Sequence, residues 1–361
     1  SGTAIVELQG KARICGTETF VGDFYLQDCF STINSRYFYM KYDSSKDLSD
    51  FTQKVRLGLD MKDSYLNFKS IGKFAPSLAE SSLTFYIDGA ITGPVRDISA
   101  KSLVVTSESG HSFLDFDARI TGLPTVASTM AVASIRNSST TFNDIANIVA
   151  SINNTRKNKV LASLAKGSRF NYTGSLTGML TDFVIDGKVS SPVGVSDVDL
   201  LFRVEENAGT RFKGFVDLDN VNLGYILNKG IFGEATANSS LDVLFKRKGG
   251  MEITIDTISV DNFLFYGYNY SDIHGSGEYN EGIFRGEIVS NDPNLKFAYN
   301  GMASLNGSPL NGSEYDFSAE LSYANLAALN FDIANNVSEM AFCSHFSSGF
   351  CPSSIAIHND G

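Results

Sequence analysis

The chain has no tryptophan, seven prolines and four cysteines among its 361 residues. Four cysteines are too few to hold a fold of this length together by disulfides. No apolar run reaches the ~18–20 residues that a membrane-spanning helix needs, and no cleavable signal peptide is visible before the first strand-like stretch. The sequence therefore favours a fold that depends on ordinary hydrophobic packing.

Basic residues are also scarce. The 29 Lys and Arg residues stand against 40 Asp and Glu residues, which gives a formal net charge of −11. This balance argues against nucleic acid as a partner and against a polybasic hold on anionic lipid, because both need clustered Lys and Arg. A hydrophobic content of 43% excludes a disordered chain.

Motifs of common enzymes are missing from the sequence. It contains no G-x-S-x-G, H-E-x-x-H, P-loop or dinucleotide fingerprint. The four histidines, His111, His274, His345 and His358, lie far apart and outside any such motif. We therefore expect a protein that is not an enzyme, with no catalytic residue and no cofactor.

The cysteines are grouped by end of the chain. Cys15 and Cys29 could close one short loop, and Cys343 and Cys351 another, so both pairs stay open as disulfides or free thiols. With His345, the second pair offers only three candidate zinc ligands, in a C-x-H-x5-C spacing that structural zinc sites do not use. We expect no bound metal.

Alternation of apolar and polar residues is the strongest pattern in the chain. It runs through residues 114–120, 198–205, 251–256 and 316–321. Because successive side chains of a strand point to opposite faces, this pattern predicts a sheet with one apolar and one polar face. Thirty-two glycines and Asn-Gly steps such as Asn300-Gly301 predict turns between the strands. The fold class predicted is all-β, an antiparallel meander.

Helical periodicity is rare and local. Residues 141–152 predict one helix, with Thr141 and Asp144 as a capping box. The basic residues that follow, from Arg156 to Lys166, are interpreted as a solvated face rather than a patch for lipid headgroups. Asn222 and Asn325 each precede two apolar residues three apart, which predicts a single helical turn capped by the asparagine.

Weak internal repeats suggest how the chain is organised. Residues 89–97 and 174–182 share the pattern G-x-[IL]-T-G-x-[VL]-x-D. The predicted segments are a strand-rich N-terminal part (1–79), a repeat unit with the helix near 141–152 (80–167), two further repeat units (168–228 and 229–335) and a tail (336–361).

Three segments carry a family resemblance. Residues 85–97, 118–124 and 288–297 resemble the C-terminal, strand-rich region of the TamB (translocation and assembly module) and AsmA-like family, in the style of its Bacteroidetes members. The resemblance covers roughly residues 60–335.

The resemblance implies a fold and a function. The family's fold is an elongated meander curled into a taco-like groove with a few short helices. Its members are periplasmic proteins of envelope biogenesis, anchored to the inner membrane by an N-terminal helix that this sequence lacks. Their apolar groove is thought to hold phospholipid acyl chains, and they are also linked to an outer-membrane assembly barrel protein as a partner.

The alternation assigns residues to the apolar side of the sheet. A lipid groove would be lined by Phe85, Ile87, Ile91, Leu114, Phe116, Ile120, Val198, Leu200, Phe202, Val204, Leu241, Val243, Phe245, Ile253, Ile255, Phe297, Phe317 and Leu321.

Two alternatives stay open at this point. The same residues could form the core of an ordinary sandwich or barrel. The chain could also be a surface-exposed adhesin or glycan-binding module. Such a module would use aromatic platforms, and tyrosines cluster at Tyr37, Tyr39 and Tyr42 and again at Tyr266, Tyr268 and Tyr270.

Overall fold

The computed structural model describes residues 5–72, 79–125, 128–152, 156–179, 181–304, 316–330 and 339–346. The chain is an antiparallel, curled meander with a few short helices, which confirms the all-β fold predicted from the sequence. It divides into two compact units: unit 1 is Ser1–Ser163 with Gly167–Val189, and unit 2 is Leu164–Lys166 with Ser190–Gly361. The boundary after Val189 falls inside the segment 168–228 that the sequence suggests as one repeat.

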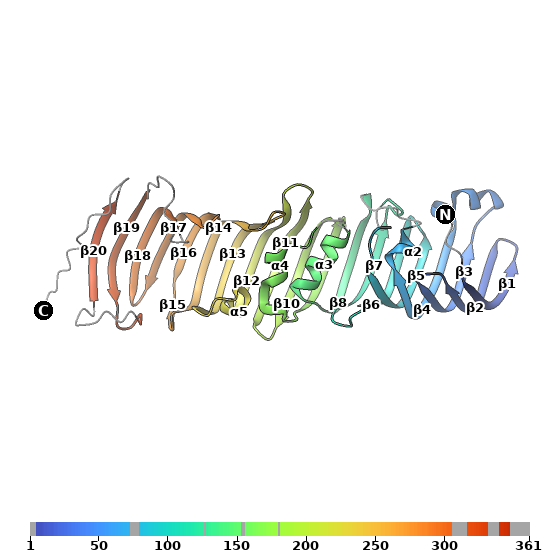
Figure 1. Cartoon of the computed structure of the whole chain (residues 1–361), viewed down its shortest axis with the longest axis horizontal. Helices are drawn as coiled ribbons and strands as arrows, with labels where there is room; N and C mark the ends of the chain where they lie inside the picture. Colours follow the sequence, from blue (N-terminus) through green and yellow to red (C-terminus); the bar gives the residue numbers. More distant parts are fainter. Residues whose placement is uncertain are drawn as a thin grey trace. The chain divides into compact units, whose positions relative to one another are not determined.

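Unit 1 is a meander in which each strand pairs antiparallel with the next (Figure 1). Its strands are β1 (Glu7–Cys15), β2 (Glu18–Gln27), β3 (Thr32–Lys41), β4 (Arg56–Asn67), β5 (Thr84–Pro94), β6 (Asp97–Ser107), β7 (Phe113–Thr121), β8 (Met130–Ser139), β9 (Asn171–Met179) and β10 (Asp182–Ser191).

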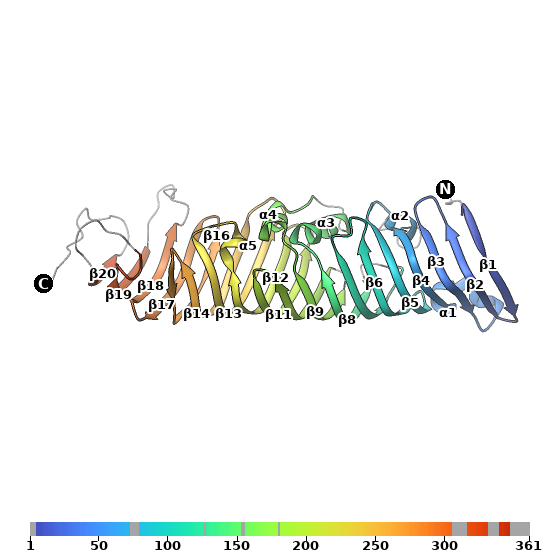
Figure 2. The same ribbon diagram turned by 90° about the horizontal axis from the view of Figure 1, so that it is seen from below.

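Short helices connect strands of this sheet. They are η1 (Ser45–Asp50), α1 (Phe51–Lys54), α2 (Phe68–Ile71), α3 (Phe142–Ile152) and α4 (Lys159–Ser163); η4 (Leu164–Gly167), which follows α4, belongs mostly to unit 2. Figure 2 shows α2 and α3 along one rim and α1 along the other. Helix α3 forms where the sequence predicts it, and Thr141 Oγ1 accepts its capping hydrogen bond from Asp144 N at 3.0 Å. The Asp144 carboxylate accepts a hydrogen bond from Ser112, at the start of β7, and so ties the helix to the sheet.

Unit 2 is a second meander of the same kind. Its elements are β11 (Gly194–Glu205), β12 (Gly209–Asn222), α5 (Leu223–Leu227), β13 (Phe232–Lys246), β14 (Met251–Phe265), β15 (Tyr268–Tyr270), β16 (Ile273–Asn280), β17 (Ile283–Asp292), β18 (Leu295–Ser304), β19 (Asp316–Asn325) and β20 (Glu339–Phe346).

Both predicted asparagine-capped turns are present in unit 2. Asn222 Oδ1 accepts a hydrogen bond from Tyr225 N at 2.8 Å and begins α5. Asn325 Oδ1 accepts from Ala328 N at 3.0 Å. The turn after Asn325 buries Leu326 and Leu329 against Tyr270 and Ala324, so this motif forms a local core at the end of the strands.

One predicted turn is wrong. Asn300 and Gly301 lie in the middle of β18, where Asn300 pairs with Glu287 and Gly301 with Gly286. Gly301 has a φ of +142°, a conformation that favours glycine, so here the residue serves a strand rather than a hairpin. The other two Asn-Gly steps, at 306–307 and 311–312, lie outside the described residues.

Candidate functional site

The apolar side of unit 1 follows directly from strand register. Residues that pair across antiparallel strands point to the same face, and Ile87 pairs with Val105, which pairs with Leu114. The six unit 1 residues assigned to the apolar side from the sequence all fall on this face: Phe85, Ile87, Ile91, Leu114, Phe116 and Ile120. We call this surface the apolar face of unit 1. Its best-packed part is formed by Phe24, Leu59, Met61, Ala100 and Leu103.

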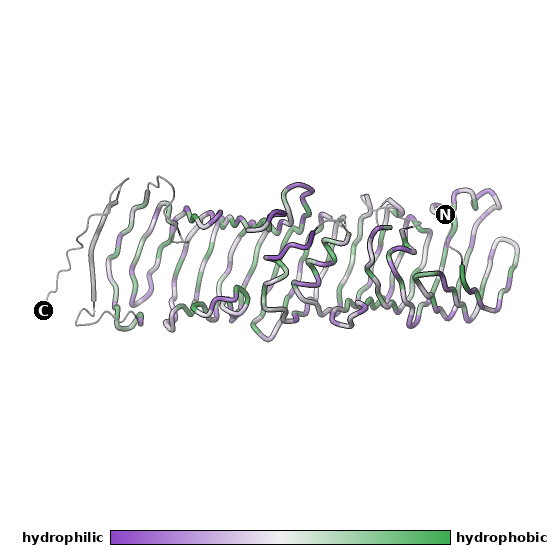
Figure 3. Tube along the Cα trace, viewed as in Figure 1, coloured by the Kyte–Doolittle hydropathy of each residue, from purple (hydrophilic) through white to green (hydrophobic). Residues whose placement is uncertain are grey.

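The same derivation defines the apolar face of unit 2. Phe202 pairs with Phe212, Phe212 with Val243, and Val243 with Ile253. The twelve unit 2 residues assigned from the sequence all point to this side: Val198, Leu200, Phe202, Val204, Leu241, Val243, Phe245, Ile253, Ile255, Phe297, Phe317 and Leu321. Figure 3 shows hydrophobic and hydrophilic positions alternating along the strands.

Burial of these side chains is incomplete. Only Phe202 and Phe245, with 4% and 7% of their surface exposed, are buried, and the other sixteen of the eighteen are half-buried. Between the two sheets of a sandwich, side chains of the inner faces interdigitate to form the core and lose their contact with water. Within each unit the described strands form one sheet, with no second sheet over its apolar face. The apolar faces are therefore surfaces as much as cores.

The opposite face of each unit is polar and carries the ion pairs. In unit 2, the Arg211 guanidinium lies 2.7 Å from Glu205 and 2.8 Å from Asp242, and Lys213 Nζ lies 3.4 Å from Asp242. In unit 1, Arg119 pairs with Asp97 at 2.7 Å. The ion pairs thus lie on one side of each sheet, beside exposed apolar side chains such as Phe20 in unit 1 and Phe215 in unit 2.

Bulges interrupt strands β4 and β6 of unit 1. Extra residues in β4 and β6 put Asp63 and Ser102 at φ values of +51° and +49°. Their N–H groups donate to carboxylates on the next strand, Asp63 N to Asp88 at 2.8 Å and Ser102 N to Asp117 at 2.6 Å. Because a bulge bends a strand and increases its twist, these two positions contribute to the curl of the sheet.

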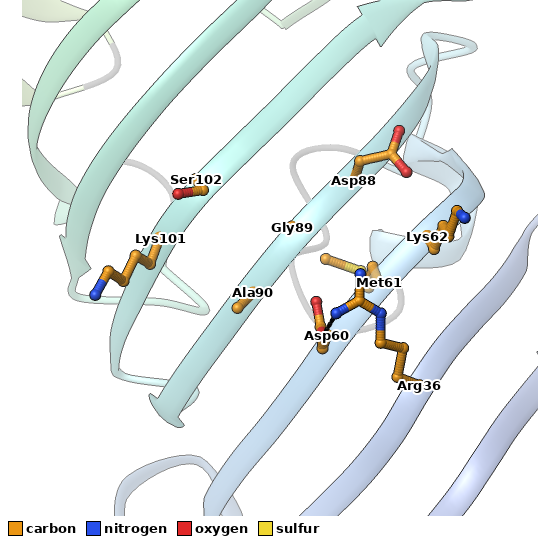
Figure 4. Close-up of a pocket in the computed structure, with 9 residues that line it drawn as sticks. All are labelled: Arg36, Asp60, Met61, Lys62, Asp88, Gly89, Ala90, Lys101 and Ser102. Atoms are coloured by element: carbon orange, nitrogen blue, oxygen red, sulfur yellow. Dashed lines mark ion pairs between the residues drawn. The ribbon is translucent and has the colours of Figure 1, made fainter.

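A shallow pocket of about 400 Å³ opens at these bulges on the polar face. Figure 4 shows its lining on β4, β5 and β6, with Arg36 of β3 reaching the Asp60 carboxylate at 3.0 Å. Lys62, Lys101 and Asp88 complete its charges. This mixture of signs on an exposed surface singles out no ligand, and the pocket lies on the side opposite the apolar face.

Aromatic rings cover glycine pairs on both apolar faces, a feature that the sequence did not reveal. Gly277 pairs with Gly286, and a Cβ added to either would lie within 3 Å of the Phe284 ring. In unit 1, the Tyr172 side chain lies over Gly174 and Gly187 in the same way. Burial raises the pKa of Tyr172 to about 12, and its hydroxyl donates to the carbonyls of Ser175 and Asp186.

A buried carboxylate lies at the end of β17 in unit 2. Asp292 has no exposed surface. Its Oδ1 accepts from the Tyr268 hydroxyl at 2.7 Å and from Asn294 N at 2.8 Å, and its Oδ2 accepts from Ser271 N and Oγ at 2.8 and 3.0 Å. Burial by itself would raise the pKa of Asp292, but these hydrogen bonds outweigh it and hold the pKa below its usual range.

The cysteines give no disulfide within the described residues. Cys15 and Cys29 are free and exposed. They lie at opposite ends of β2, since Cys15 pairs with Glu18 at its start and Cys29 follows its last residue Gln27, so of the two states left open by the sequence these cysteines have the free-thiol one. Cys343 lies in β20, and Cys351 lies outside the described residues.

The described histidines lie in different elements of the chain. His111 and His274 are exposed, and His274 Nε2 lies 2.9 Å from Asp272. His345 lies in β20, and His358 falls outside the described residues. Among the residues described, no three His, Cys, Asp or Glu side chains gather as metal ligands. Over the same ranges, no helix has the length and apolar character to cross a membrane.

The two tyrosine clusters have different environments. Tyr270 is buried and Tyr268 is hydrogen-bonded to Asp292, so only Tyr266 of the second cluster is well exposed. In the first cluster, Tyr37 stacks on the exposed ring of Phe20 with centroids 5.9 Å apart. That pair lies on the polar face of unit 1. Phe20 pairs with Tyr39, which is not one of the residues on the apolar face, and paired residues point to the same side.

Comparison with known proteins gives no relative: the chain matches no family model, no curated protein and no solved structure.

Proposed function

We propose that this protein is a non-enzymatic envelope module whose apolar faces hold the acyl chains of phospholipid. The observation that carries the proposal is that sixteen of the eighteen apolar-face residues are only half-buried, with no second sheet over them in the described part of either unit. Lipid tails require apolar area and no directional bonds, and both faces supply such area. The TamB and AsmA-like resemblance of residues 85–97, 118–124 and 288–297 points to the same ligand.

The wider context of the proposal follows from the resemblance. In a longer protein of this type, the chain would lie in the periplasm, tethered to the inner membrane by an N-terminal helix. Phospholipid would move along the apolar faces, and an outer-membrane assembly barrel would be the protein partner. Assistance in outer-membrane protein assembly is the second role that such a module would have.

The direct test places a charge on the apolar face of unit 2. Ile255 is half-buried there, opposite Leu241 and Gly277. Ile255→Glu would leave an ionised carboxylate where a lipid tail must lie, and burying such a group unpaired costs several kcal/mol. We expect the purified variant to lose binding of a fluorescent phospholipid that the unaltered protein takes up from vesicles.

A matched control carries the same glutamate on the other side of the same strand. Ser259 pairs with Asn238 and His274 on the polar face of β14, so Ser259→Glu should leave lipid uptake unchanged. If the Ile255→Glu variant does not fold, Ile255→Gln, which is polar but uncharged, takes its place in the same lipid-uptake measurement. Full lipid uptake by a folded Ile255→Glu protein, or equal loss in both glutamate variants, would contradict the proposal.

A binding site for glycans is the second candidate function, and it rests on one observation. Phe20 and Tyr37 present a stacked aromatic pair on the polar face, with 45% of the surface of Phe20 exposed. Aromatic faces of this kind pack on sugar rings. If this function holds, Tyr37→Ala abolishes binding on a glycan array, while Ile255→Glu has no effect there.

A further inference from the structure

A basic segment of this acidic chain lies between α3 and β9. Between Asp144 and Asp182 the sequence contains five Lys and Arg residues but no Asp or Glu. The structure describes the side chains of four of the five, and all four are exposed: Arg156, Lys157, Lys159 and Arg169. Among the described residues, none of these four takes part in an ion pair. We call these four residues the basic segment.

Side-chain contacts hold this segment beside the apolar face of unit 1. Lys157 Nζ donates to Asn143 Oδ1 at 3.0 Å, in the first turn of α3. The ring of Phe142, which begins the helix, packs on the ring of Phe170 with centroids 4.9 Å apart. Phe170 comes two residues before Tyr172, which covers a glycine pair on the apolar face. Because residues two apart on an extended strand point to one side, Phe170 extends the apolar face toward the basic segment.

The segment also lies where the strands of this face end. Ser151 Oγ, in the last turn of α3, is 2.8 Å from Ser81 Oγ. Ser81 comes just before β5, on which Phe85 is the first residue of the apolar face. Figure 2 shows α3 and α4 along one edge of the sheet. Since Arg169 immediately precedes Phe170, cationic side chains occupy the margin at which the apolar face stops.

A phospholipid with its tails on this part of the apolar face would place its phosphate at the basic segment. The headgroup cannot lie on apolar surface without losing its hydrogen bonds, so it must extend past the ends of the strands. Guanidinium and ammonium groups there can donate charge-assisted hydrogen bonds to phosphate oxygens. The carboxylate of Asp144, at the start of α3, already accepts a hydrogen bond from Ser112. Glu80 adjoins Ser81, at the other end of α3 from Lys157.

From this juxtaposition we propose that Lys157 and Arg169 bind the phosphate of a phospholipid, and that the basic segment makes unit 1 select lipids with a net negative headgroup over zwitterionic ones. The inference rests on the proposed function, because it supplies the headgroup contact for a lipid whose tails lie on the apolar face. It concerns one headgroup and not the attraction of the whole chain to an anionic membrane, which the net charge of −11 opposes. The sequence alone favours a solvated face for these residues, since it does not show that they lie beside Phe170.

Removal of two charges tests the inference with the full chain. Lys157→Gln with Arg169→Gln keeps two long polar side chains at exposed positions. The probes are fluorescent phosphatidylglycerol and fluorescent phosphatidylcholine, each as a trace component of the same neutral vesicles. We expect the unaltered protein to bind phosphatidylglycerol about tenfold more tightly. The double variant should lose most of this preference and keep its uptake of phosphatidylcholine.

Lys62→Gln with Lys101→Gln is the matched control. It removes two exposed charges from the polar face of unit 1, so the preference should stay. A second measurement needs no variant and decides the question if the double variant does not fold. In it, phosphatidylglycerol should protect Lys157 from acetylation, as read by mass spectrometry, and leave Lys101 reactive.

The outcomes separate this inference from the proposed function. Equal uptake of both lipids by the unaltered protein would overturn the inference alone. So would an unchanged preference in the double variant, an equal loss of preference in the control, or a Lys157 that the lipid does not protect. Uptake of neither lipid would overturn the proposed function as well.

Discussion

The buried carboxylate of Asp292 offers the sharpest test of the structure. Four donors converge on it: the Tyr268 hydroxyl and Asn294 N on one oxygen, and Ser271 N and Oγ on the other. In Asp292→Asn, one of these oxygens becomes an NH₂ group that faces two donors. Each buried donor left without an acceptor costs about 1–3 kcal/mol, so the substitution should lower the free energy of unfolding by about 2–5 kcal/mol.

The dependence on pH has a defined sign. The pKa of Asp292 is lowered in the folded chain, so protons bind the unfolded chain more readily. Its contribution to stability is therefore complete above the unfolded pKa of about 4 and is lost as the pH falls through the folded value. Asp292→Asn should remove this component, so that the stability of unit 2 falls less steeply below about pH 4.

The assay is urea unfolding of the chain, with hydrogen exchange at the amides of unit 2 as the measured quantity. The amides of Ser271 and Asn294 report directly on the site because both donate to Asp292. Asp256→Asn is the control, since Asp256 is exposed and its contact with Ser240 is 3.5 Å long. An Asp292→Asn protein that unfolds at the same urea concentration as the unaltered chain would refute the assigned network.

Two other substitutions probe the apolar face of unit 2. Gly286→Ala should destabilise the unit by about 2 kcal/mol or more, because the new Cβ would lie 2.2 Å from Ser276 O. Gly230→Ala, at a position with no atom within 4 Å, is its control in the same urea titration. Tyr299→Phe should raise the free energy of unfolding by up to about 1 kcal/mol, because the buried Tyr299 hydroxyl has no hydrogen-bond partner in the part of the chain described. A less stable Tyr299→Phe protein would show that the hydroxyl has a partner.

Alternation alone was sufficient to predict which side chains share a face, but only between bulges. Within 114–120 and 198–205 the period of two is unbroken, and residues chosen there fall on one side. The bulge in β6 puts Ala100 and Leu103 on the same face although they are three apart. The sequence marks no such position, because the bulge is defined by the strand that lies opposite.

Contacts between distant strands explain what the sequence could not show. Asp292 stands in an Asp-Pro-Asn step that predicts a turn, but its partners Tyr268 and Ser271 come from the region of β15, two strands earlier in the chain. Phe284 covers a glycine that belongs to its neighbouring strand. Both features depend on register, and register is not visible in a single strand.

On the apolar face of unit 1, buried polar side chains are already hydrogen-bonded to the backbone. Ser35 Oγ donates to Tyr37 O and accepts from Asp60 N, and Ser64 Oγ bonds the N–H and carbonyl of Asn34. These buried serines satisfy backbone groups that the bulges leave out of the ladder, and each has already donated its only hydroxyl hydrogen, so neither can donate to a ligand. What this face offers a ligand is then mainly apolar area, as the proposed binding of acyl chains requires. A ligand selected by area alone is selected by the length of its hydrocarbon, at about 0.8 kcal/mol for each buried CH₂ group, and its headgroup must be recognised elsewhere or not at all.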